Sequence, residues 1–293
     1  MIPKQYLPTN DLLFKKVFAS SGNENVLKGL ITDVLGLPIE TVTITTPYAI
    51  DTFYKDHATH KLQDTEVDLK AELSDGSVVT IEVQLQQHQF FKERVLYYAL
   101  ETYIANYSKQ TVGNKYRSLT PVFGINIIDF ILFPQSEGVL QHFELYNKAA
   151  NLPYQRSGAQ PPIALTFFEL AKRQPHQRSV INEWRRYFKT GVVSKQAPPY
   201  LQQACHLAQY QNLSKEERTM VDATQKARDI QEAFMADAEE RGIERGIERG
   251  ERQNQMKIIH RMRTKGMSNE EISVLTGIES SEIKRLMKTA LID

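Results

Sequence analysis

Acidic and amide side chains recur on two neighbouring segments of the chain, residues 66–73 and 79–86. In each segment polar and apolar residues alternate, which is typical of a half-buried β-strand. Asp68 lies in the first segment, and Glu82 and Gln84 lie in the second. Carboxylate oxygens suit Mg²⁺, which needs only one or two of them because water and substrate phosphate complete its shell. From the alternation alone a solvated strand face is the simpler interpretation, since antiparallel sheets commonly have one side in water. The functional interpretation is a site in which Asp68 and Glu82 share a divalent cation.

The residues between the two segments, Ser74-Asp75-Gly76-Ser77, have turn chemistry and predict a β-hairpin. Opposite residues of an antiparallel pair share a face, so burying both apolar sets together requires paired residue numbers with an even sum. A two-residue turn would pair Ser74 with Ser77 and fail this condition. A three-residue loop with a left-handed glycine, or a bulge, satisfies it and sets Asp68 opposite Glu82 or Gln84.

Hydrophobic periodicity and turn residues predict the surrounding elements. Helices are expected over residues 11–18, 25–35, 90–107 and 171–189, and strands over residues 42–50, 121–133, 139–146 and 163–168. Strands, then a helix, then more strands indicate a mixed α/β core. Asp11 is interpreted most simply as a capping residue of the first helix. Lys92 and Arg94, in the first turns of the helix after the hairpin, could reach a phosphate, although solvation is the simpler interpretation.

His57 and His60 have a spacing that suggests a pair of metal ligands. We do not favour this interpretation, because the stretch is polar and loop-like and no cysteine or third histidine is near.

The composition changes near residues 190–199, which predicts three parts: residues 1–190, a helical linker over 191–252, and a small helix-turn-helix-like tail over 253–293. Residues 240–252 repeat the tetrad Glu-Arg-Gly-Ile, with glycines at 242, 246 and 250. On a helix these glycines form a stripe that permits close approach of a partner helix, and a homodimer is one interpretation. The other, which we favour, is a solvated linker, since each glycine costs about 0.5–1 kcal/mol in helix propensity.

The tail has the signals of short helices joined by a tight turn. Ser268 and Glu271 form a capping box, and Gly277 suits the turn. Seven basic residues accompany these helices: Lys257, Arg261, Arg263, Lys265, Lys284, Arg285 and Lys288. DNA binding and a protein-binding or oligomerising role are both open.

Composition indicates an ordinary globular protein. The chain has 293 residues, of which 41% are hydrophobic and 24% charged, with 36 Lys and Arg against 35 Asp and Glu. Because the net charge is near zero, contact with nucleic acid requires a local basic patch. The single cysteine, Cys205, forms no internal disulfide, and no leader or long apolar run is present. We expect a cytoplasmic protein without a membrane span.

Several short motifs, taken together, carry a family resemblance. They are residues 10–18 (NDLLFKKVF), 66–68 (EVD), 81–84 (IEVQ), 92–98 (KERVLYY), 167–172 (FFELAK) and the Glu-Arg-Gly-Ile repeats. The chain resembles the bacterial Rpn family of recombination-promoting nucleases, often labelled transposases, within the PD-(D/E)XK nuclease superfamily. The resemblance covers most of the chain from residue 8 to about residue 189, together with the glycine-containing repeats.

The resemblance implies a Mg²⁺-dependent DNA endonuclease with a mixed sheet flanked by helices. It assigns Asp68 and Glu82 to the cation and Gln84 to the position that is lysine in most of the superfamily. An amide orients water but carries no charge to stabilise the transition state. Lys70 is therefore our candidate for a relocated cation, and Asp11 a candidate supporting acid. The alternative function is a non-catalytic or self-inhibited DNA-binding or regulatory protein, with defence against foreign DNA as one setting.

Overall fold

The computed structural model describes residues 6–46, 48, 68–109, 115–155 and 160–289. It separates into two compact units, residues 1–225 and 226–293. His57, His60 and the first residues of the predicted hairpin, Glu66 and Val67, lie outside the described residues.

A mixed sheet of six strands organises the first unit, in the order β1-β2-β3-β4-β8-β5. The strands are β1 (Val42–Ile44), β2 (Leu69–Leu73), β3 (Val78–Gln84), β4 (Val122–Ile128), β8 (Ile163–Glu169) and β5 (Leu140–Glu144). The three strands β3, β4 and β8 are parallel, and the remaining pairings are antiparallel. The predicted mixed α/β fold is confirmed.

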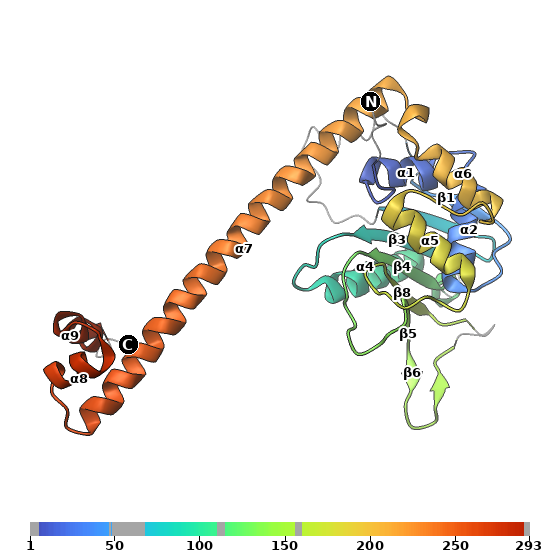
Figure 1. Cartoon of the computed structure of the whole chain (residues 1–293). Coiled ribbons are helices and arrows are strands. Elements are labelled where there is room, and N and C mark those ends of the chain that lie inside the picture. Colours follow the sequence, from blue (N-terminus) through green and yellow to red (C-terminus); the bar gives the residue numbers. More distant parts are fainter. Residues whose placement is uncertain (1–5, 47, 49–67, 110–114, 156–159, 290–293) are drawn as a thin grey trace. The chain divides into compact units, whose positions relative to one another are not determined.

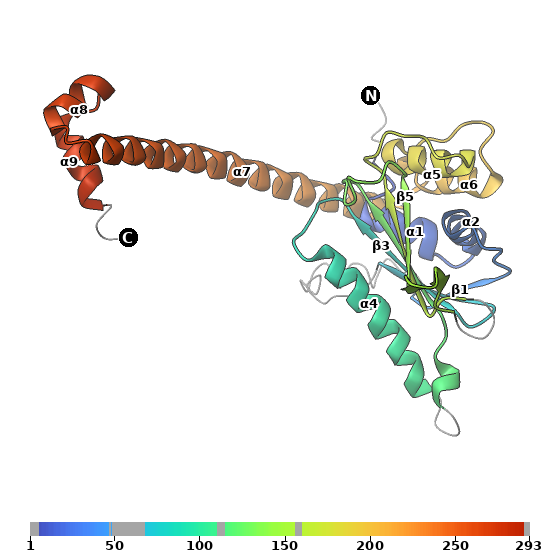
Figure 2. The same ribbon diagram turned by 90° about the horizontal axis from the view of Figure 1, so that it is seen from below.

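Helices cover both faces of this sheet (Figures 1 and 2). On one face lie α1 (Asp11–Ala19), α2 (Glu24–Leu35), α5 (Ser179–Thr190) and α6 (Pro199–Leu207); on the other lies α4 (Phe91–Ala105). The larger core joins apolar residues of the first four helices to those of the strands, with Trp184 and Phe18 fully buried in it. Smaller clusters around Phe91 and Ala99 join α4 to the opposite face.

The hairpin of β2 and β3 has the even register that burial of both apolar sets requires. Leu69 pairs with Ile81 and Ala71 with Val79, so every paired sum is 150. Backbone hydrogen bonds from Leu73 N to Ser77 O and from Gly76 N to Leu73 O close a three-residue loop. Gly76 has φ of 79°, the left-handed conformation that glycine adopts without steric cost. The predicted three-residue loop is confirmed, and the same register carried back one residue sets Asp68 opposite Glu82.

The predicted elements around the hairpin are present, with shorter bounds at several ends. The strand expected over 121–133 ends at Ile128, and the helix expected over 171–189 begins at Ser179. Residues 129–138 form bends and turns instead, and Glu169 accepts the backbone N–H groups of Leu132 and Phe133 there. An apolar run alone cannot locate such an end, because the residues beyond it are buried as well.

The first unit continues past residue 190, where the composition indicated a boundary. Ala197, Leu201 and Ala204 pack in the same core as α5. The first residues of α7 (Lys215–Thr264) also belong to this unit, since Met220 and Val221 pack against Leu12 and Leu13 of α1. Tertiary packing, which composition does not report, therefore sets the end of this unit.

The second unit contains the remainder of α7, α8 (Asn269–Thr276) and α9 (Ser280–Thr289). Ile259, Ile272, Ile283 and Leu286 form its small core. The predicted capping box is confirmed, because Ser268 and Glu271 exchange both side-chain to backbone hydrogen bonds. Gly277 has φ of 69° and ends α8 as expected. Within the described part of the chain, no helix is both long and apolar enough to span a membrane.

Candidate active site

Asp68 lies immediately before β2, at the end of the sheet where the parallel strand β3 finishes. Its Oδ2 accepts the backbone N–H of Val83 at 2.6 Å, because β3 extends past the start of β2 and leaves that donor without a strand partner there. The residue is only partly exposed. Burial raises the pKa of the Asp68 carboxyl to about 7. The negative charge of Asp11 contributes in the same direction, and that of Glu82 contributes least.

Glu82 and Gln84, on β3 at the same end of the hairpin as Asp68, project toward α4. The guanidinium of Arg94 donates to Glu82 Oε1 at 2.5 Å and to Gln84 Oε1 at 2.7 Å. Burial raises the pKa of Glu82, and the charge of Arg94 acts against that rise. Arg94 therefore holds an acid and an amide of β3 in one arrangement.

The polar face of β3 is not a solvated face. Thr80 is buried, and Glu82 and Gln84 are only partly exposed, because α4 packs over them. The apolar residues Val78 and Ala99 belong to the same contact. Acidic and amide residues under a helix need a specific arrangement of partners, which favours a functional interpretation of this face.

Asp11 approaches Asp68 from α1, on the other side of the sheet edge. Its charge is the second largest cause of the raised pKa of Asp68, so the structure brings these two carboxylates together. Lys15, one turn along α1, forms an ion pair with Asp11 at 3.1 Å and moderates this repulsion. The capping interpretation of Asp11 is wrong: Asn10 is the N-cap, and its side chain accepts the Leu13 N–H. Asp11 occupies the first helical position, where a negative charge is favourable.

The two other basic candidates, Lys70 and Lys92, have different surroundings. Lys70 lies opposite Thr80 in the hairpin, two residues from Asp68, so about 7 Å separates their Cα atoms along the strand. Lys92 lies over the ring of Phe133, with its Nζ 5.0 Å from the ring centre. Arg94, which we expected either to reach a phosphate or to be solvated, instead bonds the two site residues of β3.

The side chains fit a hard divalent cation. Glu82 Oε2 is buried and has no hydrogen-bond partner within the part of the chain that the structure describes. The raised pKa of Asp68 reflects first its burial and then the repulsion of neighbouring carboxylates, which a bound cation would relieve. Among the described residues, no three His, Cys, Asp or Glu side chains together could hold a metal ion. Water and substrate oxygens would have to complete the shell, as is usual for Mg²⁺.

This arrangement of a hairpin, a parallel strand and flanking helices agrees with the comparison with known families. The model of the PD-(D/E)XK nuclease family transposases matches residues 8–237. The chain belongs to this family. The match spans more than half of the chain and includes Asp11, Asp68, Glu82 and Gln84. Searches of curated proteins and of solved structures gave no match.

The sequence alone missed the role of Arg94 in this family member. The signal that could have found it is its spacing: Arg94 follows Gln84 by ten residues, at the start of a helix that must fold back over β3. Phe90 has φ of 65°, and this left-handed residue begins that reversal. Such a conformation is not predictable from a phenylalanine, since left-handed residues are usually glycine or asparagine.

Proposed function

We propose that this chain is a divalent-cation-dependent DNA endonuclease that hydrolyses phosphodiester bonds, with Mg²⁺ as the expected ion. Its setting is DNA recombination or the movement of mobile elements. The observation that carries the proposal is the grouping of Asp68, Glu82 and Gln84 at the carboxyl end of β3 in a nuclease-family chain. The orphaned oxygen of Glu82 supports the need for a cation there.

In this proposal each of the five side chains has a separate role. Asp68 and Glu82 hold the cation, and Gln84 orients the attacking water through its amide. Lys70 offsets negative charge near the scissile phosphate, and Asp11 supports Asp68 as a further acid. A bound divalent cation lowers the pKa of water and neutralises charge on the phosphate. Arg94 positions Glu82 and Gln84 through the two hydrogen bonds described above.

The proposal includes a homodimer through α7 and a cytoplasmic location. An enzyme that cuts both strands of a duplex benefits from two sites related by symmetry. Cys205 is a free thiol, which is usual for proteins of a reducing compartment.

One observation favours a second candidate, a self-inhibited or non-catalytic DNA-binding regulator, for instance in defence against foreign DNA. The ion pair of Arg94 with Glu82 competes with a cation for the same carboxylate. If that pair is not displaced, the chain binds DNA without cutting it.

The test is cleavage of supercoiled plasmid by the purified protein with Mg²⁺, with EDTA, and by the variants Asp68→Ala and Glu82→Ala. We expect nicking or linearisation that needs Mg²⁺ and falls at least about 100-fold in either variant, the usual scale for loss of a group that stabilises the transition state. Glu72→Ala is the matched control, because Glu72 is an exposed carboxylate of the same hairpin.

DNA affinity is measured in parallel by fluorescence anisotropy. Loss of cleavage with retained affinity in Asp68→Ala supports the enzyme. Binding without cleavage in wild type, with every metal tested, supports the regulator instead. Equal cleavage by wild type and both variants would contradict the proposed site and indicate a contaminant or another site.

A further inference from the structure

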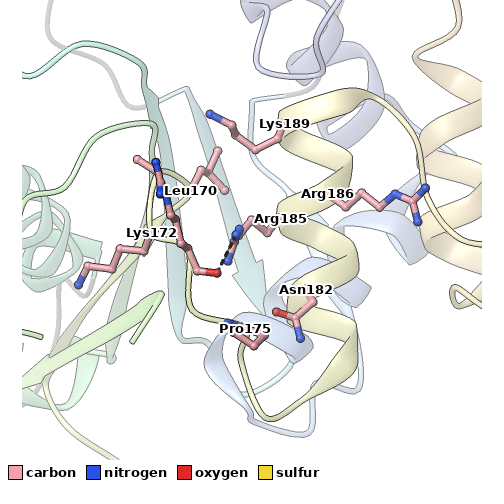
Figure 3. A pocket seen from close by; sticks show the side chains of 9 residues that line it. Leu170, Lys172, Pro175, Asn182, Arg185, Arg186 and Lys189 are labelled. Atoms are coloured by element: carbon pink, nitrogen blue, oxygen red, sulfur yellow. Dashed lines mark hydrogen bonds between the residues drawn. The ribbon is translucent and has the colours of Figure 1, made fainter. Parts of the chain in front are cut away.

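A basic pocket lies beside the carboxyl end of β8, between the loop that follows this strand and α5 (Figure 3). Its volume is about 410 Å³. Five of its lining residues are lysine or arginine, and none is acidic: Lys172, Arg173, Arg185, Arg186 and Lys189. The chain as a whole is almost neutral, so this concentration of one charge is local.

The positive charge of the pocket is only partly neutralised by nearby carboxylates. Lys172 pairs with the buried Glu169, and Lys189 donates to the Asp129 carboxylate at 2.8 and 3.1 Å. Arg185 donates instead to two backbone carbonyls, Gln174 O at 3.0 Å and Arg173 O at 3.3 Å. These acceptors carry no charge, and the guanidinium has five N–H donors, so Arg185 keeps both its charge and donors for an anion.

The shape of the pocket is held by the same contacts. Figure 3 shows Arg185 reaching from α5 toward the strand side, with its bond to the backbone oxygen across the pocket. Asn182, one turn earlier on α5, bonds both the N–H and the C=O of His176 and fixes the loop on the far side. The arginine is therefore presented by a braced loop and a helix, which reduces the entropy lost when an anion binds.

The pocket and the candidate active site share one edge of the sheet. The parallel register places Gln84, Ile128 and Glu169 in one row across β3, β4 and β8. Asp129, the residue after β4, donates its N–H to Gln84 O at 3.1 Å, and its carboxylate accepts a hydrogen bond from Lys189 at 2.8 Å. Two strand spacings, about 10 Å, separate β3 from β8 along this row, so the pocket and the candidate active site lie at the same carboxyl end of the sheet.

We propose that this pocket binds the phosphate backbone of the DNA that flanks the scissile bond, with Arg185 and Lys189 as its principal contacts. The proposal rests on the proposed function, because the ligand is the same DNA. Arginine suits phosphate oxygens through paired N–H donors, and such contacts position the duplex without reading its sequence. Arg173, exposed at the rim, adds a further positive charge.

The experiment measures duplex DNA binding by fluorescence anisotropy in EDTA, over about 50–200 mM salt, where no cleavage interferes. The test variant is Arg185→Gln with Lys189→Gln. Its matched control is Lys115→Gln with Arg117→Gln, which removes the same charge from a short 3-10 helix (Lys115–Ser118) a few residues before β4, at the amino end of that strand. We expect the test variant to bind at least about tenfold more weakly, with a salt slope lower by about two, since each lost phosphate contact lowers it by about one. The control keeps the wild-type slope.

Because Arg185 also holds the loop in place, its loss could weaken DNA binding through misfolding, and a second variant separates the two effects. Arg173→Gln alters only an exposed side chain, and we expect its slope to fall by up to one while its thermal midpoint is unchanged. An unchanged slope in both the double variant and Arg173→Gln, with wild type still binding and cutting DNA, overturns the pocket proposal alone. An equal loss in the control overturns it too, because net charge would then suffice.

Two other outcomes separate this proposal from the proposed function. If wild-type protein binds no DNA under any condition, both the proposed function and the pocket proposal are overturned. A different result is that inorganic phosphate binds the wild type and not the double variant, while the salt slopes of DNA binding are the same for both proteins. The pocket is then a site for free phosphate, and the DNA proposal is overturned.

Discussion

Glu82 and Asp68 are acids of one hairpin held in different ways. Glu82 has a cation, Arg94, on one oxygen and no described hydrogen-bond partner on the other. Asp68 accepts a single backbone N–H and lies near the like charge of Asp11. Glu82 is therefore oriented by Arg94, whereas Asp68 is inclined to keep its proton until a cation or a change in pH removes it.

Replacing Arg94 by alanine tests whether it positions the site. We expect Arg94→Ala to raise the Mg²⁺ concentration for half-maximal cleavage about 10- to 100-fold, the usual scale when a group that orients metal ligands is lost. Lys92→Ala is the control, because it removes a neighbouring charge of the same helix that contacts Phe133 instead. If Arg94→Ala instead needs less Mg²⁺ for half-maximal cleavage than wild type, the guanidinium occupies the cation position, as the regulator hypothesis requires.

The raised pKa of Asp68 predicts how the stability of the metal-free protein depends on pH. The folded protein holds this proton up to a pH of about 7, whereas the unfolded chain releases it near 4. The free energy of unfolding contributed by this group is therefore highest at low pH and falls as pH rises between these values. Asp68→Asn removes that fall.

We measure the free energy of unfolding by urea in EDTA. From pH 5 to pH 8 we expect the free energy of unfolding of wild type to fall relative to that of Asp68→Asn by on the order of 2 kcal/mol. Asp75→Asn is the control. Hydrogen bonds from Gln160 and Ser77 hold the pKa of Asp75 below its usual range, so its contribution changes only at lower pH. A constant difference between Asp68→Asn and wild type over this range would show that the carboxyl is not perturbed.

At the scale of elements, the contact of α2 with α6 depends on one glycine. A Cβ on Gly29 would lie 2.4 Å from Cδ2 of Tyr200. The Tyr200 ring stacks on Trp184 and its hydroxyl donates to Asp33 at 2.7 Å, so the ring is held on two sides. This contact helps to seat α6, and hence the chain beyond residue 190, on the nuclease core.

We expect Gly29→Ala to lower the free energy of unfolding by about 1–3 kcal/mol, because overpacking outweighs the better helix propensity of alanine. Chemical denaturation measures this. Gly242→Ala is the comparison, since nothing among the described residues lies within 4 Å of a Cβ there. A stabilised Gly29→Ala variant would show that Tyr200 moves aside easily.

At the scale of the whole molecule, the repeated glycines of α7 are the feature that bears on oligomerisation. Gly242, Gly246 and Gly250 have nothing within 4 Å of an added Cβ among the described residues. Ile243 and Ile247 beside them are more than half exposed. Each glycine weakens the helix, and no packing among the described residues compensates for it, so the proposed homodimer through α7 would have to supply that compensation.

We expect the triple change Gly242→Ala, Gly246→Ala and Gly250→Ala to increase helicity by circular dichroism and to weaken dimerisation about tenfold or more, as overpacking at a close helix contact would. Sedimentation equilibrium measures the association. Asn254→Ala, at an exposed position of the same helix, is the control. Unchanged association would identify the repeat as a solvated linker.

The amino-acid sequence by itself determined the local structure of this protein. Period-two alternation predicted β2 and β3, and the parity of their apolar residues predicted the three-residue loop at Gly76, because these depend only on neighbouring residues and turn geometry. The motif residues predicted the nuclease family, and Ser268 and Glu271 predicted a helix cap.

Only the tertiary structure decided which distant side chains meet. The contact of Arg94 with Glu82 and Gln84, the approach of Asp11 to Asp68, and the basic pocket beside β8 each join separate elements. The same holds for α6, whose place in the core no composition shift could reveal. Such contacts depend on how helices fold back over a sheet. The spacing of residues along one strand or helix does not determine that arrangement.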